Sequence, residues 1–249
     1  MLKGQKILVM GVANKRSIAW GCAQAIIAAG GDVIYTYQNE RIKQKLLKIL
    51  PAEATLVACD VSDDQAIETA FQTIKAEIGM IDGIVHAISF ANREELEGVV
   101  YETSREGYLL AQEISAYSLI AVAKYGRLIL KQPGSIVTLT YFGSERAIPN
   151  YNVMGIAKAS LEASVRYLAR DLGAENIRVN AISAGAIKTL AVTGVKDYRA
   201  LLDESERRTV DGQSVTIEEV GNTASFLLSP LASGITGDVI YVDKGVHLI

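Results

Sequence analysis

The feature that most constrains the fold is a regular alternation of short apolar runs with longer segments of helical pattern. The apolar runs are rich in Val, Ile and Leu, which is typical of strands buried on both faces of a parallel sheet. These predicted strands cover residues 6–11, 32–37, 55–59, 83–88, 135–140, 177–182 and 238–242. The main predicted helices cover residues 17–29, 63–78, 104–131, 151–173 and 217–229. This alternation predicts a Rossmann-like α/β fold, a doubly wound parallel sheet of about seven strands with helices on both faces.

Length, composition and charge favour one soluble domain over a multidomain or membrane protein. Of the 249 residues, 49% are hydrophobic and only 4 are Pro, so we expect residues 1–249 to form a single domain without linkers. The net charge of −3 provides no electrostatic attraction to nucleic acid or to an anionic membrane. The chain enters its first strand almost at once, and no apolar run reaches about 18 residues. We therefore expect no signal peptide, no membrane insertion and a cytoplasmic location.

The cysteines and histidines suggest core positions rather than a metal centre. Cys22 and Cys59 lie within apolar patterns and lack the spacing of metal ligands. We expect both to be buried, reduced thiols, and we expect no metal site. His86 lies inside a predicted strand, where a hydrogen-bonded core histidine is a commoner role than a catalytic one.

The first strand is followed by a turn and a helix start that are typical of dinucleotide binding. Gly11 ends the strand and Ser17 begins the helix, where backbone N–H groups and the helix dipole can bind a pyrophosphate. The strict G-x-G-x-x-G spacing is absent, because only Gly11 and Gly21 are present. A plain structural turn, in which Ser17 only caps the helix, is therefore an equal alternative.

The ends of the second and third predicted strands indicate which dinucleotide would bind. Gln38 follows the second strand, where it can bond ribose hydroxyls but offers no charge to a 2′-phosphate, which favours NADH. Arg41 lies nearby and keeps NADPH open as an alternative. Asp60 and Val61 follow the third strand, where they could meet the adenine ring.

The stretch that the predicted sheet would position for chemistry contains Tyr141, Tyr151 and Lys158. Tyr151 and Lys158 are seven residues apart on a predicted helix, so they share one face about 10 Å apart along the axis. A nearby ammonium favours phenolate character in Tyr151 and supports a hydrogen bond from its hydroxyl to a developing oxyanion. Tyr141 ends the preceding strand, where parallel sheets place functional residues. A core tyrosine and a solvated lysine are the alternative for the pair taken alone.

With these residues, the chain resembles the short-chain dehydrogenase/reductase superfamily and, within it, the bacterial enoyl-acyl-carrier-protein reductases of type II fatty acid synthesis. Classical superfamily members have Tyr-x3-Lys, whereas this chain has the Tyr151-x6-Lys158 spacing of the enoyl reductases, with Tyr141 ten residues upstream. The Gly-x5-Ser-Ile start of the family matches Gly11, Ser17 and Ile18. Residues 147–163 (AIPNYNVMGIAKASLEA) and 178–185 (RVNAISAG) are also close to the family form.

The resemblance implies reduction of a trans-2-enoyl thioester by hydride transfer from NADH. Tyr151 would donate to the thioester carbonyl and stabilise the enolate, Lys158 would hold the nicotinamide ribose, and Tyr141 and Ala91 would line the acyl site. Residues 188–214 would form a helical flap over the substrate. The cofactor contacts implied are Gly11, Ser17, Ile18, Gln38, Asp60, Val61, Ile88, Lys158, Ile187, Lys188, Thr189, Leu190 and Ala191.

The resemblance also implies partners. The substrate would arrive on an acyl carrier protein, which is acidic, and the chain would form a homotetramer through the helices at residues 104–131 and 151–173. A basic rim would then be needed near the site. The candidates for this rim are Lys188, Lys196, Arg199, Arg207 and Arg208.

The chain departs from the family pattern at a few positions, and two other functions stay open beside the reductase. Ala186 replaces a usual Pro, Lys244 replaces a small residue, and Ser89 and Phe142 are unusual beside the predicted pocket. One alternative is a short-chain dehydrogenase/reductase acting on a carbonyl substrate, against which the Tyr151-x6-Lys158 spacing argues. The other is a non-catalytic paralogue that binds NADH without reducing enoyl thioesters.

Overall fold

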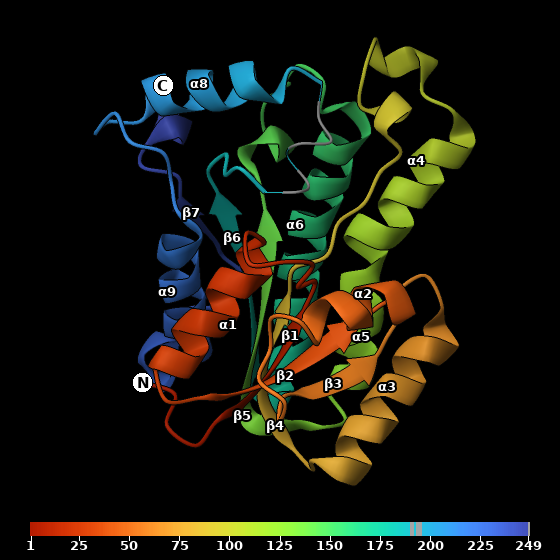
Figure 1. Cartoon of the computed structure of the whole chain (residues 1–249), viewed down its shortest axis with the longest axis vertical. Coiled ribbons are helices and arrows are strands. Elements are labelled where there is room, and N and C mark those ends of the chain that lie inside the picture. The colour runs from red at the N-terminus through yellow and green to blue at the C-terminus, as the bar shows by residue number, and fades with distance from the viewer. Residues whose placement is uncertain (190–191, 193–195, 249) are drawn as a thin grey trace.

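The computed structural model describes residues 1–189, 192 and 196–248, and its central feature is one seven-stranded parallel sheet in the order β3-β2-β1-β4-β5-β6-β7 (Figure 1). Every neighbouring pair of strands is parallel. The predicted doubly wound α/β fold is therefore confirmed. The strands are β1 Lys6–Met10, β2 Asp32–Tyr37, β3 Thr55–Ala58, β4 Ile81–His86, β5 Leu130–Thr140, β6 Ile177–Ala184 and β7 Val239–Val242.

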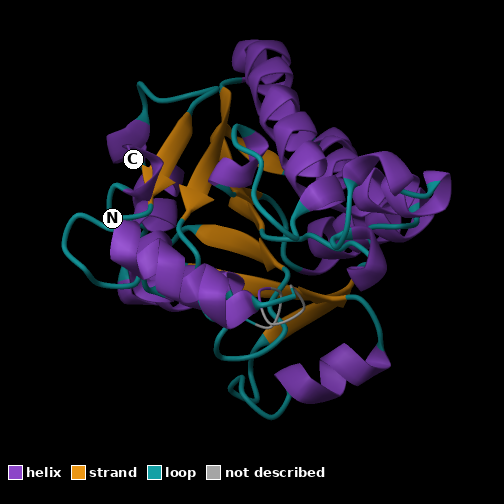
Figure 2. Ribbon diagram, turned by 90° about the horizontal axis from the view of Figure 1, so that it is seen from above, coloured by secondary structure: helices purple, strands orange, loops and turns teal. Residues whose placement is uncertain are grey.

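Helices cover both faces of this sheet, as seen from above in Figure 2. One apolar core lies between the sheet and α3, α5 and α6, and a second lies between the sheet and α1, α9 and the end of α2. The central strands are buried almost throughout because both faces are covered. The α-helices are α1 Ile18–Ala28, α2 Glu40–Leu46, α3 Asp64–Glu77, α4 Arg105–Gln112, α5 Ser118–Gly126, α6 Asn152–Leu172, α8 Tyr198–Arg208 and α9 Ile217–Leu228. None of the described helices is long and apolar enough to cross a membrane.

Helices α1 and α9 touch backbone to backbone through two glycines. A Cβ placed on Gly21 would lie 2.7 Å from the carbonyl carbon of Ile217, and one on Gly221 would lie 2.6 Å from that of Gly21. Only hydrogen fits at either position, because non-bonded carbons prefer about 3.5–4.0 Å. Gly21, which the sequence suggested as a remnant of a phosphate-binding motif, therefore serves helix packing.

Lys244 ties the C-terminal segment to α9 and to the chain that precedes α9. Its ammonium pairs with Asp211 at 3.3 Å and with Glu219 at 3.4 Å, and its carbonyl accepts from the Val210 amide at 3.0 Å. Lys244 has φ of 53°, a left-handed conformation in which a side chain other than Gly or Asn is strained. Lysine at this position, where the family usually has a small residue, therefore forms two ion pairs that a small residue could not form.

The structure corrects three sequence expectations about the helices. Helix α2 was not predicted; Asn39 caps it by accepting from the Ile42 amide at 3.1 Å. The single helix predicted over residues 104–131 is instead α4, a π-helical turn at Glu113–Tyr117, and α5. Helix α5 ends at Gly126, and the apolar run at residues 128–130 leads into the sheet. Lys131 therefore belongs to β5. Helix α8 is shorter than the helical flap predicted over residues 188–214, part of which lies outside the described residues.

Candidate active site

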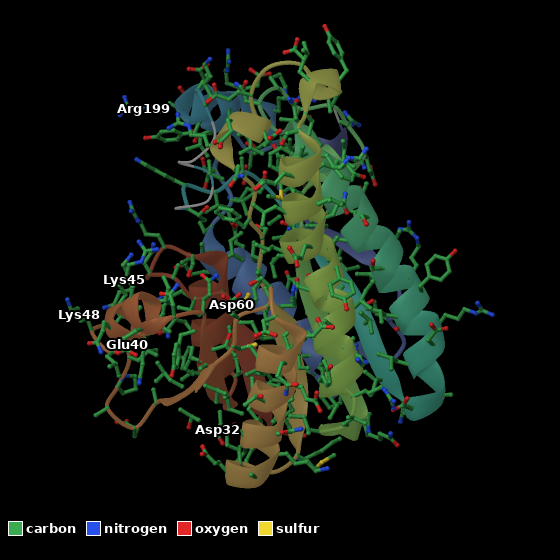
Figure 3. All side chains as sticks on the ribbon, turned by 90° about the vertical axis from the view of Figure 1, so that its right-hand side faces the viewer. Asp32, Glu40, Lys45, Lys48, Asp60 and Arg199 are labelled. Carbon is green, nitrogen blue, oxygen red and sulfur yellow. The ribbon has the colours of Figure 1, made fainter. Side chains whose placement is uncertain are left out.

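The carboxyl ends of the parallel strands lie at one edge of the sheet, where the connections to the helices gather. Figure 3 shows this polarity, with Asp60 just after β3 well above Asp32 at the start of β2. Ligands of doubly wound sheets bind at this edge. The sequence-predicted residues in the described parts of the chain follow strands β1 to β6, begin α1 or lie on α6, and they are therefore brought toward the same edge.

The turn between β1 and α1 is held tightly against the neighbouring strand. Gly11 has φ of +95°, and a Cβ on it would lie 2.8 Å from the carbonyl carbon of Ala87 after β4. Ser17 caps α1: its Oγ accepts from the Trp20 amide at 3.3 Å and donates to the Asn14 carbonyl at 2.7 Å. Ser17 was expected either to cap the helix or to bind a phosphate, and both roles require the N-terminus of α1. The structure shows the helix-capping role. Ile18 is the first residue of α1.

A hydrogen bond joins the two residues predicted to meet the adenosine. The Gln38 amide nitrogen, just after β2, donates to the Asp60 carboxylate at 3.2 Å, just after β3. Val61 beside them is buried in the core under the sheet. Gln38 is exposed and Asp60 is half-buried, so both retain polar atoms for a ligand.

The two tyrosines predicted to act on substrate lie against each other. The rings of Tyr141 and Tyr151 have centroids 5.1 Å apart with planes at 74°, an edge-to-face contact. The close approach depends on Gly143, where a Cβ would lie 2.7 Å from the Tyr151 ring. Tyr151 is the residue just before α6 rather than inside it, with φ of −123°. The predicted helix start was therefore one residue too early.

Lys158 is a buried cation held by the backbone of β5. Its side chain is on the buried face of α6, with 6% of the residue exposed, and its Nζ donates to the Leu139 carbonyl at 2.8 Å. Burial lowers the pKa of Lys158 to about 8, although Glu162 nearby acts to raise it. The alternative of a solvated lysine is wrong.

The phenol groups are kept protonated, which corrects one expectation. Burial, followed by the influence of Tyr141 and Glu162, raises the pKa of Tyr151, and Lys158 is not among the causes. Burial likewise raises the pKa of Tyr141 to about 12. The expectation that a nearby ammonium would favour phenolate was wrong because desolvation of the anion dominates. Tyr151 is therefore a neutral hydrogen-bond donor at neutral pH.

His86 is a satisfied core histidine, as expected. Its Nδ1 lies 3.0 Å from the Thr138 hydroxyl and its Nε2 lies 2.8 Å from the Ser118 hydroxyl. Burial, with a smaller contribution from the charge of Lys158, lowers the pKa of His86 to about 3. Its ring is neutral at physiological pH and links β4, β5 and α5. Cys22 and Cys59 are also buried and unpaired in disulfides, as predicted.

A small apolar cluster at the tyrosines brings together the loop after β4 and helices α4, α6 and α8. Ala91, from the loop after β4, and Tyr151 pack with Tyr198 and Leu201 of α8 against a buried group that includes Met154 of α6. The loop itself is anchored by Ser115, which the sequence did not single out. The Ser115 hydroxyl accepts from the Phe90 amide and donates to the Phe90 carbonyl, both at 2.9 Å. Ser115 lies on the π-helical turn, and such turns are frequent at functional sites.

The segment after β6 borders a cleft of about 600 Å³. Ile187 and Lys188 line it together with Lys15 and Arg16 from the turn before α1, two cations that the sequence patterns did not single out. Thr189 is buried, Ile88 is half-buried against the core, and the predicted contacts Leu190 and Ala191 lie outside the described residues. Lys15 and Arg16 could have been selected from the sequence, because they are basic residues in the turn between the first strand and its helix, where a phosphate would bind.

The candidate basic rim is partly neutralised within the chain. Lys196 pairs with Glu97 at 3.4 Å and Arg207 with Glu204 at 2.6 Å. Lys188 and Arg199 are exposed, and Figure 3 labels Arg199 at the outer surface of α8. Arg208 is half-buried, and its charge counteracts the rise in the pKa of Tyr141.

Comparison with known proteins identifies the family. A family model described as Enoyl-(Acyl carrier protein) reductase matches residues 11–247. The chain belongs to this family. It is 63% identical over 247 residues to the Enterococcus faecalis enoyl-[acyl-carrier-protein] reductase [NADH] FabI, covering 99% of each chain. It is 50% identical over 252 residues to a Staphylococcus aureus FabI named for NADPH, covering 100% of this chain and 98% of that one.

Solved structures of the enoyl reductase family have the same fold. A Bacillus cereus enoyl-acyl carrier protein reductase with NADP+ and indole naphthyridinone superposes with a TM-score of 0.97 at 50% identity, covering 100% of this chain and 99% of that one. The Aquifex aeolicus enoyl-[acyl-carrier-protein] reductase (NADH) has a TM-score of 0.97 at 42% identity, covering 100% and 98%. The resemblance noted in the sequence is confirmed over essentially the whole chain.

The residues at the enoyl reductase site fit a nicotinamide dinucleotide. The N-terminus of α1 and the cations Lys15 and Arg16 suit a pyrophosphate, and the Gln38–Asp60 pair suits ribose and adenine polar groups. The Lys158 ammonium suits ribose hydroxyls. Among the residues that the structure describes, no group of three or more His, Cys, Asp or Glu side chains could hold a metal ion.

Proposed function

We propose that this protein reduces trans-2-enoyl thioesters carried on acyl carrier protein to acyl thioesters, using NADH, in fatty acid elongation. Family membership and the 63% identity to a reductase named for NADH support the reaction and the cofactor. The observation that carries the residue assignment is the packing of Tyr151 against Tyr141 at the end of β5, the strand whose Leu139 carbonyl holds the buried cation Lys158. Gln38, which offers no charge to a 2′-phosphate, supports NADH over NADPH.

Tyr151 acts as the hydrogen-bond donor to the thioester oxygen. Bound NADH supplies a hydride to the β-carbon of the enoyl group, and negative charge then develops on this oxygen. Because burial raises the pKa of Tyr151, its hydroxyl is neutral and keeps a proton to donate to that oxyanion. The donor is held rigidly by the edge-to-face contact with Tyr141 and by Gly143, so little reorganisation is needed during the reaction. The enolate is then protonated at the α-carbon.

Lys158 binds the nicotinamide ribose and maintains a positive field at the site. An ammonium has three N–H donors. One N–H of Lys158 donates to the Leu139 carbonyl, so two remain for ribose hydroxyls. The other proposed cofactor contacts are Gly11, Ser17, Ile18, Gln38, Asp60, Val61, Ile88 and residues 187–191. We add Lys15 and Arg16 for the pyrophosphate.

The acyl chain occupies the apolar surface formed by Ala91, Tyr141 and Tyr151, with α8 above it as a flap. The cluster that joins Ala91 and Tyr151 to Tyr198 and Leu201 supports this placement, since an apolar cover excludes water from the oxyanion. We also propose that residues 1–249 act as one catalytic domain, in the cytoplasm, as a homotetramer. Light scattering that detects only monomer would contradict the tetramer.

The test follows NADH oxidation with a trans-2-enoyl thioester in the wild type and in Tyr151→Phe. We expect turnover with NADH to fall about 100-fold or more in the variant, because one oxyanion donor contributes about 10²–10³ in rate. Tyr167→Phe, which removes an exposed hydroxyl on the same helix, is the matched control and should behave as wild type. Measurable NADH binding without turnover in the wild type would instead support the non-catalytic paralogue. Turnover with NADPH alone would overturn the assignment of Gln38.

A further inference from the structure

The buried residue Glu162 has no part in the proposed hydride transfer, yet it lies one helical turn beyond Lys158 on α6. Only 6% of Glu162 is exposed, and it belongs to the same buried stripe of the helix as Lys158. Burying an ionised carboxylate is strongly unfavourable unless a compensating charge or hydrogen bonds accompany it. Packing alone therefore does not explain a glutamate at this position.

Consecutive residues at the end of β5 hold the two side chains in place. The Thr140 hydroxyl donates to Glu162 Oε1 at 2.6 Å. The Leu139 carbonyl accepts from Lys158 Nζ at 2.8 Å. Residues four apart on a helix are surface neighbours, so the carboxylate and the ammonium lie on the same side of α6. The strand thus fixes both charges with one short segment.

Glu162 is the negative charge that acts on Lys158. Burial lowers the pKa of Lys158 to about 8, and Glu162 opposes this change. His86, which faces Lys158 from β4, is neutral because its pKa is lowered to about 3. Tyr141 and Tyr151 remain uncharged, since burial raises the pKa of both phenols.

The other titratable and charged groups near Glu162 and along the neighbouring elements do not change this balance. Tyr241 of β7 is neutral, because burial raises its pKa to about 12. Arg178 lies near the start of β6, where its partner in the sheet register is Ser135, four residues before Leu139 on β5. Its guanidinium donates to the Ser229 and Ile235 carbonyls. The charged residues Glu113 and Lys124, on the π-helical turn and α5, are exposed to solvent.

We infer that Glu162 is a positioning residue of the reductase, whose carboxylate keeps the Lys158 side chain charged and in place for the cofactor at neutral and mildly alkaline pH. The inference rests on the proposed function for the role of Lys158 toward NADH. Thr140 orients the carboxylate, and the Leu139 carbonyl orients the ammonium. The pair of charges is therefore part of the cofactor site, although only Lys158 reaches the ligand.

The test measures the dissociation constant of NADH by fluorescence from pH 6 to pH 9 in the wild type and in Glu162→Gln. In the wild type, affinity should weaken as pH rises through about 8, where Lys158 loses its proton, rather than near its usual 10.5. Glu162→Gln keeps the volume and an acceptor for Thr140 but removes the charge. We expect its weakening to begin about one pH unit lower, with about fivefold weaker binding at pH 8 and little change at pH 6.

Thr140→Val is the matched control, because it removes the hydroxyl but leaves the carboxylate charge. It should lower affinity by a similar factor at every pH without moving the midpoint, and Glu162→Asp should restore the wild-type midpoint. A Glu162→Gln midpoint equal to that of the wild type would overturn the inference, as would an equal shift in Thr140→Val. These titrations need no thioester, so a wild type that binds NADH without reducing the substrate would refute the proposed function alone.

A further variant covers the case in which Glu162→Gln does not fold. Lys158→Gln combined with Glu162→Gln removes both buried charges, so that neither is left buried without the opposite charge. A folded double variant would then support the charge pairing. An unfolded one would show that Glu162 has a packing role independent of Lys158, and this would overturn the inference.

Discussion

The contact between α1 and α9 makes a stability prediction whose sign depends on tertiary structure. Gly21 lies inside α1, where Gly→Ala in an exposed helix would stabilise by about 1 kcal/mol. At this position the new Cβ would lie 2.7 Å from the Ile217 carbonyl carbon, against a preferred separation of about 3.5–4.0 Å. The obstacle is backbone, which cannot rotate away, so α1 and α9 must separate. We therefore expect Gly21→Ala to destabilise the fold.

The magnitude follows from two opposing contributions. Overpacking costs about 1–3 kcal/mol, and a rigid backbone obstacle places this case near about 3 kcal/mol. Helix propensity offsets about 1 kcal/mol, which leaves a net loss of about 2 kcal/mol in the free energy of unfolding. For a chain of this length, that corresponds to a thermal midpoint about 4–8 °C lower.

Gly173→Ala is the matched control because the same atom is added in open space. Gly173 follows α6 with φ of −58° and ψ of −37°, and a Cβ added there would have no neighbour within 4 Å. The substitution should raise the free energy of unfolding by about 0.4–1 kcal/mol, through lower entropy of the unfolded chain. Both variants are compared with wild type by urea unfolding and by calorimetry. A Gly21→Ala protein as stable as Gly173→Ala would refute the backbone contact between α1 and α9.

Three further predictions concern the site and its supports. Gly11→Ala should raise the dissociation constant of NADH at least about 10-fold in a fluorescence titration, because a residue with a Cβ is strained by about 1–2 kcal/mol at positive φ; unchanged affinity would contradict it. Ser115→Ala removes both hydrogen bonds to the Phe90 backbone, which loosens the loop that carries Ala91. Steady-state kinetics should show a KM for the enoyl thioester about 5–10-fold higher, with NADH binding unchanged; an unchanged KM would contradict this prediction. Lys244→Asn keeps the left-handed backbone but loses two ion pairs, so its thermal midpoint should fall at low salt and the difference should shrink in high salt; a salt-independent difference would contradict it.

Much of the fold could be predicted because local pattern and tertiary structure agree. Strand β2 spans the predicted residues, and α1 starts after Ser17 and ends before the glycines at residues 30 and 31, as the capping signals indicate. The helix over residues 104–131 failed because apolar spacing does not distinguish a continuous helix from one interrupted by a π-helical turn. Helix α2 was overlooked because it is short and mostly polar, with Leu46 as its one buried residue.

The candidate site was predicted only as a set of residues. The spacing of Tyr151 and Lys158, together with the motifs around it, indicated the family, the family implied the reaction, and Gln38 favoured NADH. The protonation states depended on burial: Lys158 has a lowered pKa and Tyr151 a raised one, whereas the sequence suggested a phenolate favoured by the ammonium. Ser115 and Glu162 could not be selected, since their partners Phe90 and Thr140 lie more than 20 residues away in the chain.

The sequence by itself determined the succession of strands along the chain, the glycines and caps at the turns, and the residues that characterise an enoyl reductase. These features depend on local periodicity and backbone chemistry, which the neighbouring residues specify. Only the tertiary structure decided that Gly21 serves helix packing, that His86 is neutral, and that Glu162 faces Lys158. Desolvation and close contact depend on segments far apart in the sequence, so their effects arise only when the sheet and its helices are assembled.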